Sequence, residues 1–152
     1  MRFALLVSAY HDFVTTRLES GARAELVALG IDDADVSTFQ VPGAYELAQA
    51  AERLASSGGW SGVVCLGCLI RGETPHFDYI ATAAADGIMR AAQATGVPVA
   101  FGVLTTNTAE EAMARAGEGV TNKGREAARA AWEMAQLYAR LDVQRKSAGR
   151  HE

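Results

Sequence analysis

Four short apolar runs recur along the chain, and a segment with helical character follows each of them. The runs cover about 3–9, 35–41, 62–66 and 99–105. Their length and composition are typical of strands that are buried on both faces. Strands that alternate with helices of ten or more residues form right-handed βαβ units and a parallel sheet. The sequence therefore predicts an α/β fold, a three-layer sandwich with a central four-stranded parallel sheet flanked by helices on both faces.

The helical segments carry their own start and stop signals. Asp12 is a plausible N-cap for the first helix, and Gly30 is placed to close it. Thr108 and Glu111 match a capping box, which predicts a helix from there towards Arg115. The first helix also has an apolar stripe at helical spacing, formed by Val14, Leu18, Ala22, Leu26 and Leu29.

Size and composition limit the class of protein. The chain has 152 residues, of which 49% are hydrophobic and 21% charged, and this suits one globular domain over 1–152 with a polar, frayed tail at about 143–152. The formal net charge of −4 argues against nucleic acid as a partner. No apolar run approaches the ~20 residues of a membrane helix, and the N-terminal run is too short for a signal peptide. A cytoplasmic location is expected.

The stretch with the most chemically informative residues follows the third apolar run. It reads Gly67-Cys-Leu-Ile-Arg-Gly-Glu-Thr-Pro-His-Phe-Asp-Tyr79. We interpret it as a glycine turn leading into a helix, with Thr74 as the N-cap and Pro75 at the first helical position. Free backbone N–H groups at such a helix start favour an anion. His76 would lie beside that anion as a proton carrier. The triplet alone is weak evidence, since it also fits a simple helix cap.

Cys65 and Cys68 form a C-x-x-C pattern that could indicate a redox or zinc site. Three steps along a strand span roughly 10 Å and reverse the face of the sheet. A disulfide needs Cα atoms within about 7 Å of each other. The chain has no further cysteine to complete a zinc site. Both residues are expected to be reduced strand cysteines.

Chemically notable residues follow the strands at their carboxyl ends. These are Tyr10, Tyr45, Glu46, the loop at 68–76 and the threonines at 105–106. Ligands of parallel α/β sheets bind at this edge. The sequence therefore predicts that these residues share one rim.

Three blocks of sequence together resemble the 6,7-dimethyl-8-ribityllumazine synthase family. They are Val41–Glu46, Leu66–Tyr79 and Phe101–Thr105, and the triplets 115–117 and 122–124 fall at the family's spacing. The long Arg-Gly-Glu-Thr-Pro-His-Phe-Asp-Tyr run is highly specific. The resemblance covers nearly the whole chain.

This resemblance implies a flavodoxin-like fold and a transferase of riboflavin biosynthesis. The enzyme would condense 5-amino-6-(D-ribitylamino)uracil with 3,4-dihydroxy-2-butanone 4-phosphate, giving 6,7-dimethyl-8-ribityllumazine, phosphate and water. The implied route is imine formation, phosphate elimination, ring closure and loss of water, with no metal and no other cofactor. The resemblance also implies a homo-oligomer, a pentamer or an assembly of pentamers, with each site between two subunits.

The resemblance assigns site residues as well. His76 would be catalytic, as the group that moves protons. The implied phosphate ligands are Gly72, Glu73, Thr74 and Arg115. The implied contacts to the ribitylaminouracil are Tyr10, Ala44, Tyr45, Glu46, Cys68, Leu69, Ile70, Phe101 and Lys123. Tyr10 would stack on the pyrimidine, Glu46 would accept from ribityl hydroxyls, and Phe101 would come from a neighbouring subunit.

The chain departs from the family at one edge of the expected site. It has Ala9-Tyr10-His11 where many relatives show Arg-Phe-Asn or a similar triplet, which keeps an aromatic ring and loses a positive charge. His11 is interpreted as a rim residue. The alternative to an enzyme is a non-catalytic shell protein that binds a lumazine or flavin in the same pocket. The joint presence of Glu46, His76 and Arg115 argues against it.

Overall fold

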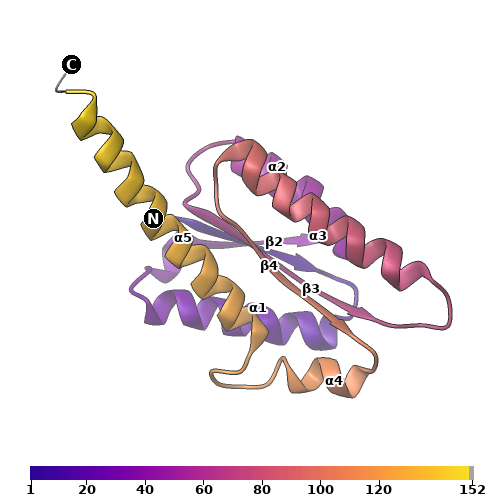
Figure 1. Ribbon diagram of the computed structural model, residues 1–152. Helices are drawn as coiled ribbons and strands as arrows, with labels where there is room; N and C mark the ends of the chain where they lie inside the picture. Colours follow the sequence, from indigo (N-terminus) through magenta and orange to yellow (C-terminus); the bar gives the residue numbers. More distant parts are fainter. Residues whose placement is uncertain (151–152) are drawn as a thin grey trace.

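A parallel four-stranded sheet in the order β2-β1-β3-β4 forms the centre of the computed structural model, which describes residues 1–150 (Figure 1). The elements are β1 (Phe3–Ser8), α1 (Asp12–Ala28), the 3-10 turn η1 (Asp33–Asp35), β2 (Val36–Val41), the 3-10 turn η2 (Ala44–Glu46), α2 (Leu47–Ser56), β3 (Gly62–Ile70), α3 (His76–Thr95), β4 (Val99–Thr106), α4 (Ala109–Ala114) and α5 (Lys123–Ala148). The predicted α/β fold with a four-stranded parallel sheet is confirmed.

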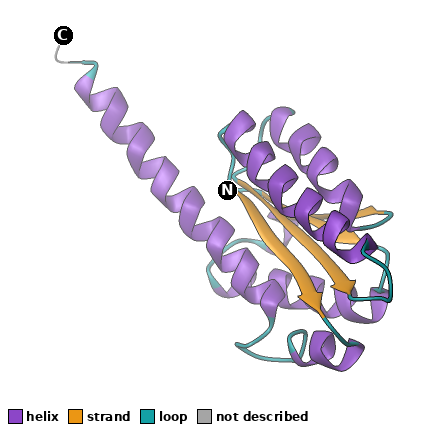
Figure 2. Cartoon of the chain, turned by 45° about the vertical axis from the view of Figure 1, so that its right-hand side comes forward, coloured by secondary structure: helices purple, strands orange, loops and turns teal. Residues whose placement is uncertain are grey.

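Helices cover both faces of the sheet, because strand residues alternate between two apolar clusters. Phe3 and Leu5 of β1 pack with residues of α1, α4 and α5. Ala4 and Leu6 of the same strand pack with residues of α2 and α3. Both views show α2 and α3 together on one side and α1 and α5 on the other (Figures 1 and 2). β1 is fully buried, as expected of a strand covered on both faces.

β3 is longer than the sequence indicated. The expected end at residue 66 and the glycine turn at Gly67 are wrong, because β3 continues to Ile70. The reason lies in the neighbouring strand: β4 pairs with β3 through Gly67↔Val103 as far as Ile70↔Thr106. Gly67 is therefore a strand residue, and the turn begins at Arg71.

Asn122 fastens the start of α5 to α1. Its side-chain oxygen accepts hydrogen bonds from the N–H groups of Gly124 and Arg125, at 2.8 and 3.2 Å. Its amide nitrogen donates to the carbonyls of Arg17 and Gly117, at 3.2 and 3.0 Å. The side chain is buried and satisfied at both ends, so it acts as a helix cap and as a clamp between elements.

An ion triad reinforces the same contact between α1 and α5. The Glu25 carboxylate, 11% exposed, lies 3.1 Å from Arg125 and 2.6 Å from Arg129. Two partners offset the cost of burying the charge.

α5 continues past the body of the sheet, and its last turns project away from it (Figure 2). The sequence indicated a frayed tail from about 143, whereas residues up to Ala148 are helical; 151–152 lie outside the described residues. No helix within residues 1–150 is long and apolar enough to cross a membrane.

Gly124→Ala should destabilise the protein, because the added Cβ would lie 2.0 Å from the Leu18 carbonyl oxygen. Overpacking of this kind costs about 1–3 kcal/mol, which corresponds to a Tm lower by roughly 3–10 °C at this size. The matched control is Gly117→Ala, whose Cβ would meet nothing closer than 4.0 Å. Differential scanning fluorimetry of both variants measures the effect. Equal Tm values for the two variants would contradict the close approach of α1 and α5.

Candidate active site

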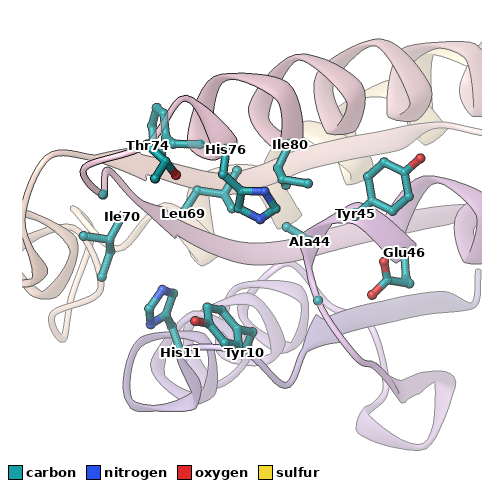
Figure 3. A pocket seen from close by; sticks show the side chains of 13 residues that line it. Tyr10, His11, Ala44, Tyr45, Glu46, Leu69, Ile70, Thr74, His76 and Ile80 are labelled. Carbon is teal, nitrogen blue, oxygen red and sulfur yellow. The ribbon is translucent and has the colours of Figure 1, made fainter.

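A pocket of about 680 Å³ lies at the carboxyl ends of β1, β2 and β3 (Figure 3). The chain leaves β1 towards β2 and then crosses to β3 on the other side of β1, so this is the switch point at which parallel sheets bind ligands. The pocket is lined by Tyr10, His11, Gly43, Ala44, Tyr45, Glu46, Leu69, Ile70, Gly72, Thr74, His76, Phe77 and Ile80.

The segment after β1 supplies an aromatic wall. Tyr10 is 65% exposed, and its ring lies 4.4 Å, centroid to centroid, from the imidazole of His11. His11 has φ 57° and is the N-cap of α1, so the interpretation of Asp12 as N-cap is wrong by one residue. A ring exposed on one face suits stacking on a planar ligand.

The segment after β2 supplies a carboxylate. Val41 ends the strand, and the short turn η2 follows at Ala44–Glu46. Ala44 is buried, while Glu46 directs its carboxylate towards the pocket (Figure 3). An ionised carboxylate accepts hydrogen bonds only, which suits a ligand with hydroxyl groups.

Arg71 holds the turn between β3 and α3. Its N–H donates to the Thr106 carbonyl at 2.8 Å, which extends the pairing of the two strands by one residue. Its guanidinium lies 3.2 Å from the Asp78 carboxylate, donates to Asn107 at 3.3 Å and covers the Phe77 ring at 4.5 Å. The turn is thus tied to β4 and to the first turn of α3.

This turn offers unused N–H groups. Pro75 is the N-cap of α3, and its carbonyl accepts from the N–H groups of Asp78 and Tyr79, so the expectation of Thr74 as N-cap is wrong. Among the hydrogen bonds of residues 1–150, none uses the backbone N–H of residues 72–74, 76 or 77. Free amides at the start of a 20-residue helix bind anions.

His76 is the first residue of α3, and its imidazole projects into the pocket beside Thr74 (Figure 3). The side chain is exposed, so both ring nitrogens are open to a ligand. A histidine next to an anion cradle can give and take protons near neutral pH.

The structure brings most of the expected site residues together. The pocket contains Tyr10, Ala44, Tyr45, Glu46, Leu69, Ile70, Gly72, Thr74 and His76. It does not contain Cys68, Glu73, Phe101, Arg115 or Lys123.

The structure shows where the expected site residues outside the pocket lie and what they contact. Cys68 is 1% exposed and its side chain packs in the cluster under α1 and α5. Phe101, 45% exposed, lies on the edge strand β4. Arg115 donates to the Glu111 carbonyl at the end of α4. Lys123 pairs with a carboxylate on its own helix at 2.8 Å.

Four lining residues were not among the substrate contacts expected from the sequence: His11, which was interpreted only as a rim residue, Gly43, Phe77 and Ile80. Ile80 lies one helical turn after His76, so the helical period could have placed it on the same face. The orientation of His11 depends on a left-handed backbone that its sequence neighbours do not signal.

Comparisons with a family model and with known proteins all indicate the same family. The family model described as 6,7-dimethyl-8-ribityllumazine synthase matches residues 1–139. A 6,7-dimethyl-8-ribityllumazine synthase of Salinibacter ruber (strain DSM 13855 / M31) is 48% identical over 141 residues, covering 93% of this chain and 90% of the relative. One of Syntrophus aciditrophicus (strain SB) is 45% identical over 141 residues, covering 93% of this chain and 92% of the relative.

Both cysteines should be unreactive in the native protein, because burial raises the pKa of Cys65 to about 12 and that of Cys68 to about 11. At pH 8, only about one thousandth of the Cys68 side chains are thiolates. We expect a thiol reagent such as 5,5′-dithiobis(2-nitrobenzoic acid) to label neither residue within minutes, and to label both in guanidinium chloride. Fast labelling of the native protein would contradict the burial of these free thiols.

Proposed function

Because the chain belongs to the 6,7-dimethyl-8-ribityllumazine synthase family, we propose that its reaction takes place in the pocket at the ends of β1, β2 and β3, completed by a neighbouring subunit. The chain is a 6,7-dimethyl-8-ribityllumazine synthase, a transferase of riboflavin biosynthesis. The observation that carries the location is the set of unused N–H groups at 72–77, which lies beside His76 and across the pocket from Tyr10.

The phosphate of the four-carbon substrate binds at the turn between β3 and α3. The N–H groups of Gly72, Glu73 and Thr74 donate to its oxygens, together with the Thr74 hydroxyl. Glu73 contributes its backbone only, in keeping with a side chain that does not line the pocket. This placement fixes the phosphate for departure as a leaving group.

The ribitylaminouracil binds along the other wall. Its pyrimidine stacks on Tyr10, and its ribityl hydroxyls donate to Glu46. Backbone groups of residues 44–46 and 69–70 border the ring and the ribityl chain. The resemblance assigns Cys68 to this wall through its backbone; its side chain takes no part, since it is buried in the cluster under α1 and α5.

His76 moves protons while the 5-amino group attacks the ketone, the imine forms and phosphate leaves. Much of the acceleration comes from holding two reactive substrates together, so the contribution of the imidazole is modest.

A neighbouring subunit supplies the remaining groups. Phe101 and Arg115 are exposed and lie outside the pocket of their own chain, and Lys123 also lies outside it. This placement leaves them free to reach a substrate in the pocket of a neighbouring subunit. Arg115 suits the phosphate through its planar fork of donors, Phe101 closes the pyrimidine slot, and Lys123 lies near the ring. A cyclic pentamer, alone or in a larger assembly, places one such boundary at every pocket.

The enzyme acts in the cytoplasm.

His76→Ala should lower kcat by roughly tenfold. This loss is smaller than the factor of about 10²–10⁴ that general acid–base catalysis often supplies, because the variant still holds the two substrates together. Lumazine fluorescence after mixing both substrates measures turnover, and analytical ultracentrifugation checks that assembly is unchanged. An unaltered kcat would remove His76 from the proton transfers. If the wild-type chain bound lumazine and formed none, it would be a binding protein.

Arg115→Ala should raise the KM for the four-carbon phosphate by about tenfold or more, with the KM for the pyrimidine unchanged. A mixing experiment tests from which subunit Arg115 acts. Subunits with His76→Ala and subunits with Arg115→Ala are denatured, mixed in equal amounts and refolded together.

Random co-assembly pairs an intact His76 pocket with an intact Arg115 neighbour at about a quarter of the boundaries. Activity is measured at a four-carbon phosphate concentration well below the wild-type KM, where both variants are impaired, and there it should exceed the mean of the two separate variants. The control is each variant refolded alone. Activity equal to that mean would show that Arg115 serves its own chain.

A further inference from the structure

His11 has the one left-handed backbone among the non-glycine residues of 1–150, with φ 57°. Side chains rarely adopt this region, and they remain there only where the surroundings fix them, often at ligand sites. Here the fixing contacts are hydrogen bonds that the His11 carbonyl accepts from the N–H groups of Val14 and Thr15, at 3.0 and 3.1 Å. The turn that starts α1 therefore directs the imidazole into the pocket.

Two aromatic rings hold that imidazole in place. The Tyr10 ring lies 4.4 Å from it and is tilted by 60°, and the Phe13 ring lies 5.8 Å from it, edge to face. The imidazole is thus oriented before a ligand arrives. Partial burial also lowers the pKa of His11 below its ordinary value of 6.5, because the charged ring is less well solvated there.

The imidazole of His11 lies at one end of the pocket. In Figure 3 its ring lies towards Ile70 and Thr74, whereas Glu46 lies at the far end beyond Tyr10. The end near Thr74 is where the unused N–H groups of the β3–α3 turn lie. A phosphate bound there faces an imidazole on the opposite wall.

We infer that His11 is a substrate-binding residue, whose imidazole contacts the phosphate-bearing four-carbon substrate and takes up a proton from solvent as that substrate binds. The inference rests on the proposed function, because it needs the phosphate at the β3–α3 turn. Imidazolium donates a charge-assisted hydrogen bond to a phosphate oxygen, which the neutral ring gives only in a weaker form. Protonated His11 thereby supplies positive charge at this end of the pocket.

The other titratable groups around His11 lie beside it in sequence or across the pocket. Tyr10 and Asp12 flank it in sequence, Asp12 being exposed and outside the pocket. Across the pocket lie Glu46, at the far end, and the imidazole of His76. The remaining lining phenol is that of Tyr45. The phosphate is the new negative charge at this end.

Imidazole NMR tests the inference directly, since the chain has only three histidines. The His11 resonance is assigned as the one lost in His11→Asn, because asparagine tolerates a left-handed backbone and keeps the turn. We expect this resonance to titrate below pH 6.5 in the free enzyme. Its midpoint should move up by about half a unit or more with saturating inorganic phosphate or the four-carbon phosphate.

Steady-state kinetics gives the second readout. In His11→Asn the KM for the four-carbon phosphate should rise roughly three- to tenfold at pH 6. This factor corresponds to a pKa shift of about half a unit to one unit. The ratio of the variant KM to the wild-type KM should become smaller towards pH 8. The KM for the pyrimidine should not change. The control is Asp12→Asn, which places the same side chain one residue later and outside the pocket.

An unshifted His11 resonance with phosphate bound, or a KM ratio that stays flat from pH 6 to 8, would overturn the inference. Either result leaves the proposed function standing if Arg115→Ala still raises the KM for the four-carbon phosphate. If Arg115→Ala has no effect on that KM, the phosphate site itself is wrong.

Discussion

The pairing of β3 with β4 up to Ile70 and Thr106 is the interaction on which the site depends. It carries β3 to the rim of the sheet, and the Arg71 N–H extends it by one further bond to Thr106. The chain must then turn at once into α3. The amides of that turn are left without partners within the described chain, and Gly72 and Thr74 line the pocket, where an anion can satisfy them.

A second constraint keeps the rest of the proposed machinery in place. Asn122, buried between α1 and α5, caps one helix and holds the carbonyls of Arg17 and Gly117. The segment between Arg115 and Lys123 is closed by a bond of 2.9 Å from the Lys123 N–H to the Arg115 carbonyl. This bond ties together the backbone positions that carry the two cationic side chains, both of which lie outside the pocket of their own chain.

Much of the architecture could be predicted from the sequence, because buried parallel strands and amphipathic helices leave strong local patterns. The four strands and the Thr108 cap of α4 agree with their signals. The errors concern the ends of helices and strands, which contacts with other segments determine. Gly67 resembles a turn residue, yet pairing with β4 keeps it in a strand. Thr74 and Asp12 resemble N-caps, yet Pro75 and His11 occupy those positions.

The sequence by itself determined the fold class, the rim on which the site residues gather and, through its specific motif, the family. These properties follow from periodicity and residue type, which are local. Only the tertiary structure decided that His11 lines the pocket, that the Cys68 side chain is buried under α1 and α5, and that Phe101, Arg115 and Lys123 lie outside the pocket. The reason is physical: where a side chain points depends on strand register and on backbone conformation, and distant segments set both.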